Sequence, residues 1–149
     1  MSPKGWTWAK GWTWSPAPPD TGGKQIPNAV RERTAHRIQK YAQKHFKGRY
    51  VRLDVRFRGR FCYIDAYVEP SVPKRLPKDF PETRTELLER LRNTPTHLCR
   101  LRYFSEERWG FALYAYSSEK YETTIIPSSG DFFGTPEEAF EAVGRHILE

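Results

Sequence analysis

YVRLDVRFRGRFCYIDAYV, residues 50–68, contains the clearest structural pattern in the chain. Apolar and polar residues alternate along both of its halves, and Arg58-Gly59 lies between them. Strict alternation around a pair that contains glycine is typical of two antiparallel strands joined by a tight turn. We therefore expect a β-hairpin with strands at Tyr50–Phe57 and Arg60–Val68 and a two-residue turn at Arg58-Gly59.

The position of the turn sets the register of this hairpin, and the register determines which side chains share each face of the sheet. With the turn at Arg58-Gly59, one face is apolar and pairs Val55 with Cys62, Leu53 with Ile64 and Val51 with Ala66. The other face carries charged and aromatic side chains, whose cross-strand contacts stabilise a sheet. The pairs expected there are Tyr50 with Tyr67, Arg52 with Asp65, Asp54 with Tyr63 and Arg56 with Phe61.

The segment before the hairpin, residues 28–47, has the periodicity of an amphipathic helix. Its apolar residues recur every three or four positions, and Gly48 follows as a helix end. The face opposite the apolar residues contains no acid. It forms a stripe of positive side chains, called here the basic stripe, which consists of Arg33, Arg37, Lys40, Lys44 and Lys47.

The rest of the chain predicts an extended, proline-rich connector at residues 69–83, a short helix at about residues 82–92, three strands and a final helix. The strands are expected at His97–Phe104, Arg108–Ser117 and Lys120–Ile126. Thr135-Pro136, followed by Glu138, combines a capping box with a proline at the first helical position, so a helix begins there. The expected fold class is α+β, in the order α-β-β-α-β-β-β-α. It has a single, mostly antiparallel five-stranded sheet with helices packed on one face and its strand order open.

The first 26 residues differ in composition from the rest of the chain. KGWTWA is followed directly by KGWTWS, and a segment rich in proline and glycine comes next, as in a linker. We interpret residues 1–26 as a flexible N-terminal arm and residues 27–149 as a single domain. The arm can pack loosely on the body, stack on unpaired bases or dock on a partner protein. Its candidate partner-binding residues are Trp6, Trp8, Trp12 and Trp14.

Positive charge is concentrated in one part of the chain. Residues 27–60 carry eleven lysines and arginines against two acids, Glu32 and Asp54, whereas the formal charge of the whole chain is +7. A cluster of this kind is typical of a surface that binds a polyanion. The function expected first is therefore a non-catalytic nucleic-acid-binding accessory protein that contacts phosphates through its basic helix.

Two surfaces on opposite sides of the molecule are candidates for this binding. The basic stripe suits phosphate contacts, and the arginine- and tyrosine-bearing sheet face suits stacking on single strands of RNA or DNA. If the predicted helix packs on the apolar sheet face, one straight duplex cannot touch both surfaces. The candidate residues are Arg33, Arg37, Lys40, Lys44, Lys47, Arg52, Arg56, Arg58, Arg60, Tyr63, Tyr67, Arg100 and Arg102.

Two other functions are considered. The first is a protein-interaction module, or a subunit of a larger complex, anchored by the tryptophan arm and by aromatic residues such as Trp109, Tyr114 and Tyr121. The second is a metal-dependent nuclease, because Asp54 and Asp65 share one face of the hairpin. No catalytic motif accompanies these two acids, so we expect no catalytic residue, no bound metal and no cofactor.

Composition also indicates the cellular compartment of the protein. No apolar run in the chain reaches the length of a membrane span, and no signal peptide is recognisable, so we expect a cytoplasmic protein without a membrane partner. Cys62 and Cys99 lack the spacing of a metal finger, and we expect them to be buried free thiols in strands.

Four segments carry a resemblance to known proteins: RLDVRFRGRFCYIDAY, THLCRLRYF, RWGFALYAYSSEKYE and SGDFFGTPEEAF. With these segments, residues 30–148 resemble a small bacterial family of uncharacterised proteins, and the tryptophan repeat lies outside the resemblance. No activity is attached to that family. The resemblance implies an independent bacterial domain and transfers no catalytic residue.

Overall fold

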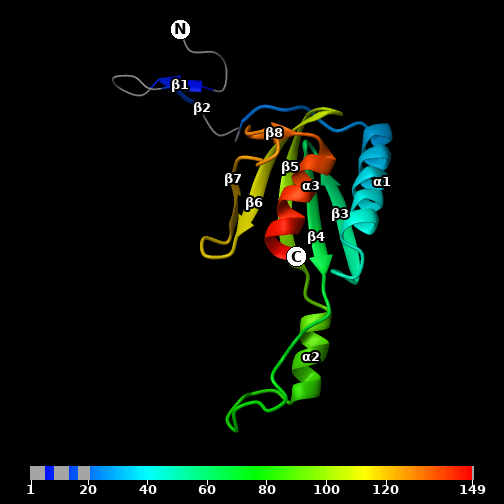
Figure 1. The fold of residues 1–149 in the computed structure, drawn as a ribbon, viewed down its shortest axis with the longest axis vertical. Helices are drawn as coiled ribbons and strands as arrows, with labels where there is room; N and C mark the ends of the chain where they lie inside the picture. Colours follow the sequence, from blue (N-terminus) through cyan, green and yellow to red (C-terminus); the bar gives the residue numbers. More distant parts are fainter. Residues whose placement is uncertain (1–5, 9–13, 17–20, 149) are drawn as a thin grey trace.

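The computed structural model describes residues 6–8, 14–16 and 21–148, and these form an α+β fold around a mostly antiparallel sheet (Figure 1). Helices α1 (Asn28–His45) and α3 (Pro136–Val143) contact each other and cover one face of this sheet. The strands are β3 (Arg52–Arg58), β4 (Phe61–Tyr67), β5 (Thr96–Ser105), β6 (Arg108–Ala115), β7 (Lys120–Thr123) and β8 (Phe133–Gly134).

The strand order, which the sequence left open, is sequential. Strands β3-β4-β5-β6-β7 are hydrogen-bonded in that order, each antiparallel to the next, and β8 pairs with β6. The sheet therefore has six strands rather than the five expected. The additional strand, β8, has only two residues, which is too short for an alternating pattern to reveal it.

The hairpin of β3 and β4 forms, but its predicted register was wrong by two residues. Val55 lies opposite Ile64 rather than Cys62, and the turn is Gly59-Arg60. Gly59 has a φ of 61°, and a type II′ turn requires such a positive φ at its first central residue, which favours glycine there. A shift of two residues leaves both faces unchanged, because side chains alternate with a period of two.

The core lies between α1, α3 and the apolar sheet face. The predicted apolar positions of α1 are confirmed for Ile38, Ala42 and Phe46, which are fully or almost fully buried. The Phe46 ring meets the Phe140 ring of α3 edge-on, with 5.6 Å between the ring centroids. Cys62 and Cys99 are buried free thiols, as expected, and burial raises the pKa of both.

Helix α3 begins where the sequence indicates. The Thr135 side chain accepts a hydrogen bond from the Glu138 backbone N–H, and the Thr135 backbone N–H donates to the Glu138 carboxylate. Pro136 occupies the first helical position. A short π-helical segment, Gly144–Leu148, continues α3, and it buries Leu148 more deeply than Ile147.

Helix α2 (Arg84–Arg92) is placed differently from the expectation. It lies in an arm, residues 69–95, that projects from the end of the sheet between β4 and β5 instead of packing on a sheet face (Figure 1). Thr83 caps the helix with a capping box to Glu86. Its buried residue, Leu87, lies outside the main core. The proline-rich connector therefore forms a projecting element, called here the α2 arm.

The tryptophan repeat contributes two short strands, β1 (Trp6–Trp8) and β2 (Trp14–Pro16). They pair antiparallel in a two-stranded sheet of their own, with Trp8 opposite Trp14. Trp12 lies outside the described residues, and partner binding by this arm stays a prediction. No helix among the described residues is long and apolar enough to cross a membrane.

Residues 21–26 lie against the body of the domain. The Lys24 backbone N–H donates to the Tyr103 carbonyl of β5, and the Ile26 N–H donates to the Gly59 carbonyl in the hairpin turn. The Ile26 side chain is buried in the core. This short segment therefore ties the chain before α1 to the strand ends of the sheet.

Candidate nucleic-acid interface

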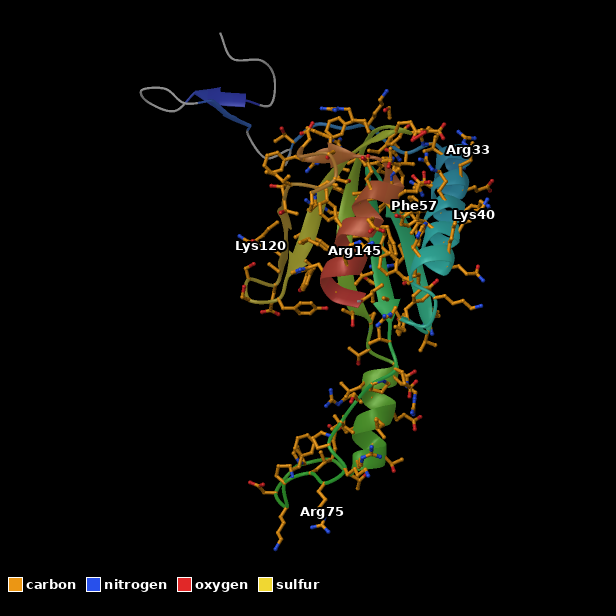
Figure 2. The ribbon with its side chains drawn as sticks, viewed as in Figure 1. Arg33, Lys40, Phe57, Arg75, Lys120 and Arg145 are labelled. Atoms are coloured by element: carbon orange, nitrogen blue, oxygen red, sulfur yellow. The ribbon has the colours of Figure 1, made fainter. Side chains whose placement is uncertain are left out.

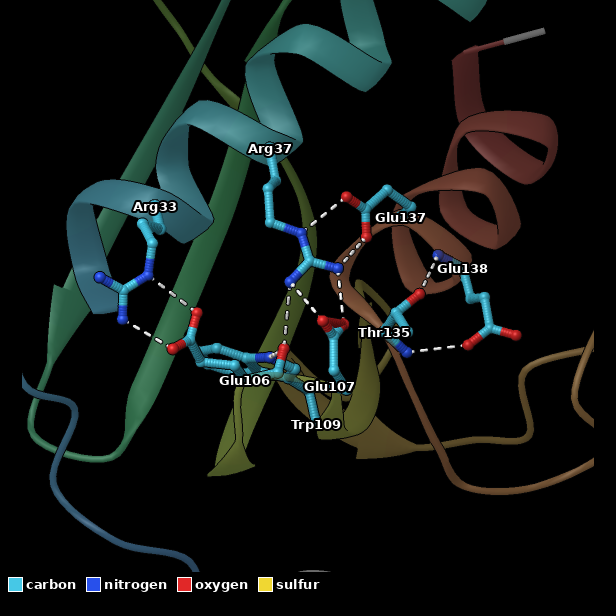
Figure 3. Close-up of polar contacts among 8 residues, drawn as sticks. All are labelled: Arg33, Arg37, Glu106, Glu107, Trp109, Thr135, Glu137 and Glu138. Carbon is cyan, nitrogen blue, oxygen red and sulfur yellow. Dashed lines mark hydrogen bonds and ion pairs between the residues drawn. The ribbon is translucent and has the colours of Figure 1, made fainter. Parts of the chain in front are cut away.

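The basic stripe on α1 divides into two parts in the structure. Arg33 Nη2 lies 2.6 Å from Glu106 Oε1, and Arg37 Nη2 lies 2.7 Å from Glu107 Oε1 and 2.6 Å from Glu137 Oε1 (Figure 3). These acids belong to the turn between β5 and β6 and to the first turn of α3. The arginine half of the stripe is therefore an ion-pair network that joins three elements.

Arg37 is the centre of this network. Its side chain is only 25% exposed, and it also donates to the Glu106 carbonyl, which accepts a bond from the buried Trp109 indole as well. Burial alone would raise the Glu137 pKa, but the hydrogen bond and charge of Arg37 outweigh it and lower that pKa. The Arg37 pKa is raised chiefly by its hydrogen bond to Glu137. Arg37 therefore stabilises the fold by joining α1 to α3 and to the turn between β5 and β6.

The lysine half of the stripe remains open to solvent. Lys40, Lys44 and Lys47 are exposed and form no ion pair within the described part of the chain. Lys40 points outward from α1, away from the sheet (Figure 2). Three of the five predicted phosphate contacts on this helix therefore keep their charge available to a ligand.

The sheet face opposite α1 and α3, called here the open face, combines arginines with aromatic rings. The Arg52 guanidinium lies 3.8 Å from the Tyr67 ring centroid, and Arg100 lies 4.5 Å from that of Phe61 and 5.4 Å from that of Tyr121. The register places these residues on adjacent strands β3, β4 and β5 and on β7. Arginines stacked on rings keep their N–H groups at the rim, where phosphates can accept hydrogen bonds.

The aromatic part of the open face is larger than the sequence indicated. Tyr63 meets Tyr121 with 5.6 Å between ring centroids, and Tyr121 meets Tyr114 at 5.0 Å. Tyr114 in turn meets Tyr116 at 4.7 Å, and the Tyr116 ring is exposed. Tyr114 and Tyr121 were predicted only as part of a protein-contact surface. The two-residue period in β6 and the β6–β7 pairing place them beside Tyr63.

Arg60 and Arg102 serve a structural purpose. Both donate to the Gly22 carbonyl, Arg60 at 3.0 Å and Arg102 at 2.9 Å, and Arg102 is buried under the N-terminal segment. Gly23 lies so close to β5 that an added Cβ would be 2.8 Å from the Tyr103 carbonyl oxygen. Of the predicted arginines on β3, Arg52, Arg56 and Arg58 are exposed.

A buried carboxylate lies in the middle of the open face. Asp65 was expected to pair with Arg52, but it lies opposite Asp54 and binds Arg56 instead, with Arg56 Nη2 2.8 Å from Asp65 Oδ2. His97 Nδ1 lies 3.0 Å from the other oxygen, Oδ1. Both Asp65 oxygens therefore have partners, and no group of three possible metal-ligating side chains occurs among the described residues.

A cavity of about 380 Å³ lies where the α2 arm joins the sheet. Its walls are mostly apolar and include Val68, Pro70 and Leu91. Tyr116 forms part of the wall, so the cavity is continuous with the aromatic end of the open face.

Comparisons of the chain with protein-family models, with curated proteins and with solved structures found no match.

Proposed function

We propose that this protein binds single-stranded nucleic acid on the open face of its sheet. The observation that carries the proposal is the alternation of arginines, exposed on β3 and half-buried on β5, with half-buried rings across four strands, on the face that α1 and α3 leave uncovered. Bases of a single strand stack on aromatic side chains, and arginines neutralise the backbone between them. A duplex conceals its base faces and gains nothing from such rings.

The open face replaces the basic stripe as the main interface in this proposal. Two of the five stripe residues, Arg33 and Arg37, already bind acids of the protein itself. The three lysines are a weaker, sequence-independent contact on the opposite side of the domain. Arg52, Arg56, Arg58 and Arg100 are the phosphate contacts on the open face, and Tyr63, Tyr67, Tyr114 and Tyr121 are the stacking residues.

Fluorescence anisotropy with labelled single-stranded and double-stranded RNA and DNA tests this proposal. We expect a preference for single strands and a slope of log K against log salt of about −3, since four phosphates are neutralised at about 0.7 each. Arg52→Gln with Arg100→Gln should weaken binding at least tenfold. The matched control, Lys40→Gln with Lys44→Gln, removes the same charge from α1 and should change affinity much less.

If the double lysine variant lost more affinity than the double arginine variant, the interface would lie on α1 instead of the open face. Equal binding of single strands and duplexes would also contradict the open face as a stacking surface. Arg37 is unsuitable as a test of binding, because its loss would break the ion-pair network and destabilise the fold.

The protein-interaction alternative is tested by truncation. Deletion should stop at residue 20, since Ile26 is buried in the core and the Gly22 carbonyl binds two arginines. If the tryptophan hairpin is a docking segment, the truncated protein should lose a partner in a pull-down and retain its affinity for nucleic acid. Loss of nucleic-acid affinity alone would instead place the tryptophans in the proposed interface.

A further inference from the structure

Asp65 is the only buried carboxylate among the described residues, and it is 3% exposed. Burying a carboxylate is costly unless it is paired and hydrogen-bonded. Here Arg56 and His97 each bind one of its oxygens, and all three side chains belong to the open face. The proposed nucleic-acid interface therefore contains an Asp–His pair beside an arginine.

The Asp65 contact determines which nitrogen of His97 is available. An ionised carboxylate only accepts hydrogen bonds, so His97 Nδ1 carries the hydrogen in this 3.0 Å contact. In the neutral ring, Nε2 is then the basic nitrogen. Nε2 has no hydrogen-bond partner within the described ranges, and the side chain is 36% exposed. A carboxylate that holds imidazole in this tautomer is the arrangement that makes histidine a general base.

Rings and an arginine surround His97 in positions suited to an RNA strand. Tyr114 lies 4.8 Å from the His97 ring, centroid to centroid, and the Tyr116 hydroxyl accepts a hydrogen bond from the His97 backbone N–H. Arg56 Nε lies 3.3 Å from Asp54 Oδ2, and Arg56 Nη2 lies 2.8 Å from Asp65 Oδ2. The Arg56 side chain is nevertheless 49% exposed, so its remaining N–H groups can reach a phosphate next to His97. Stacked bases would thus present a ribose and its phosphate to the histidine.

We propose that the open face cleaves the single-stranded RNA it binds, with His97 as general base, Asp65 as its positioning residue and Arg56 as the phosphate contact. This inference rests on the proposed function. His97 Nε2 takes the proton of a ribose 2′-hydroxyl, the 2′ oxygen bonds to the adjacent phosphorus, and the bond from phosphorus to the 5′ oxygen breaks. The leaving 5′ oxygen takes a proton from water, and His97 returns its proton to solvent.

The products are a 2′,3′-cyclic phosphate and a 5′-hydroxyl. The nucleophile belongs to the substrate, so the step needs no further reactant. Arg56 would stabilise the charge that accumulates on the phosphoryl oxygens. DNA lacks the 2′-hydroxyl, and the open face would bind it without cleaving it. This chemistry differs from the metal-dependent nuclease that the sequence suggested for Asp54 and Asp65.

The test uses the full chain, a 5′-fluorescein-labelled single-stranded RNA and a DNA of the same sequence, both in buffer with EDTA. We expect cleavage of the RNA alone, with fragments that end in a 2′,3′-cyclic phosphate. His97→Gln should reduce the cleavage rate at least a hundredfold, as for loss of a general base, while RNA affinity changes less than threefold. His36→Gln, an exposed histidine on α1, is the matched control and should cleave normally.

Asp65→Asn separates positioning from a purely structural role. If Asp65 orients His97, this variant should lower kcat with KM nearly unchanged and should alter the pH profile of cleavage, whereas a structural residue would alter only the thermal unfolding midpoint. Should Asp65→Asn fail to fold, His97→Gln still decides the question, because this half-exposed ring lies outside the main core.

RNA that is bound but left intact by the wild-type protein would overturn the cleavage proposal and leave the binding proposal standing. Cleavage that persists in His97→Gln would overturn the assignment of the base. Absence of any binding would overturn both proposals.

Discussion

At the scale of single residues, the structure separates basic side chains that look alike in the sequence. Arg37 and Lys40 both belong to the basic stripe, yet Arg37 binds two carboxylates and Lys40 points to solvent. The acids that bind Arg37 come from positions about 70 and 100 residues later in the chain. Helical periodicity predicts which face a residue shares, but it contains no information on what packs against that face.

Arg37→Gln should lower the free energy of unfolding at pH 7 by about 1–3 kcal/mol, because it removes charge-assisted hydrogen bonds from a partly buried network. Arg37 lowers the Glu137 pKa in the folded protein, so this stabilisation is present above the unfolded value of about 4.3 and is lost as pH falls through the folded value. The difference between Arg37→Gln and wild type should therefore shrink below about pH 4.

Urea denaturation of both proteins at pH 7 and pH 3 measures this difference. Lys40→Gln is the control on the same helix face and should change stability by no more than about 0.5 kcal/mol. A loss in Arg37→Gln that is as large at pH 3 as at pH 7 would show that packing of the arginine stem, rather than the ion pairs, stabilises the fold.

At the scale of elements, the sequence predicts local structure well wherever a single pattern decides it. The capping box at Thr135 and the burial of Ile38 and Ala42 follow from capping chemistry and from the helical period, and both are confirmed. The hairpin register was wrong because Gly59 can occupy either central position of a two-residue turn. Which position Gly59 occupies depends on whether its neighbour in the turn adopts a positive φ, and the residue types alone do not determine this.

The contact between Phe46, which caps the C-terminal end of α1, and the π-helical segment after α3 yields a second prediction. A Cβ added at Gly144 would lie 2.6 Å from Phe46 Cζ, far inside van der Waals contact. Gly144→Ala should therefore destabilise the protein by about 1–3 kcal/mol through overpacking. Adding Phe46→Leu to the Gly144→Ala protein should relieve part of this cost. Thermal unfolding of the two single variants and of the double variant measures how far the two changes in unfolding free energy depart from additivity. Strict additivity would contradict the steric explanation.

At the scale of the whole molecule, the α2 arm is a projecting insertion in a hairpin. Ala66 of β4 pairs with Thr96 of β5, so the two strands would be joined by a tight loop if the arm were absent. The arm's buried leucine, Leu87, contributes nothing to the main core. The proline-rich connector predicted an extended segment, and only the tertiary structure shows that this segment and its helix leave the sheet together.

Replacing residues 69–95 with a four-residue Asn-Gly-containing loop should leave the domain folded, with a thermal midpoint within about 4 °C of wild type. The open-face arginines lie outside the deleted segment, so affinity for single-stranded nucleic acid should change less than threefold. Calorimetry and anisotropy measure the two quantities. A much larger loss of stability would show that the cavity at the foot of the arm is part of the core, and a large loss of affinity would place the arm in the interface.

Local patterns in the sequence were enough to predict the α+β class, the helix starts, the apolar and polar faces of the β3–β4 hairpin and the burial of both cysteines. These features depend on side-chain periods of 2 and 3.6 and on capping chemistry, which act over a few neighbouring residues. Only the tertiary structure decided the strand order, the projection of the α2 arm, the Arg37 network and the meeting of Asp65 with His97. The β4–β5 pairing, the Arg37 network and the Asp65–His97 contact join residues 30 to 100 positions apart, and such contacts arise from packing that no local pattern records.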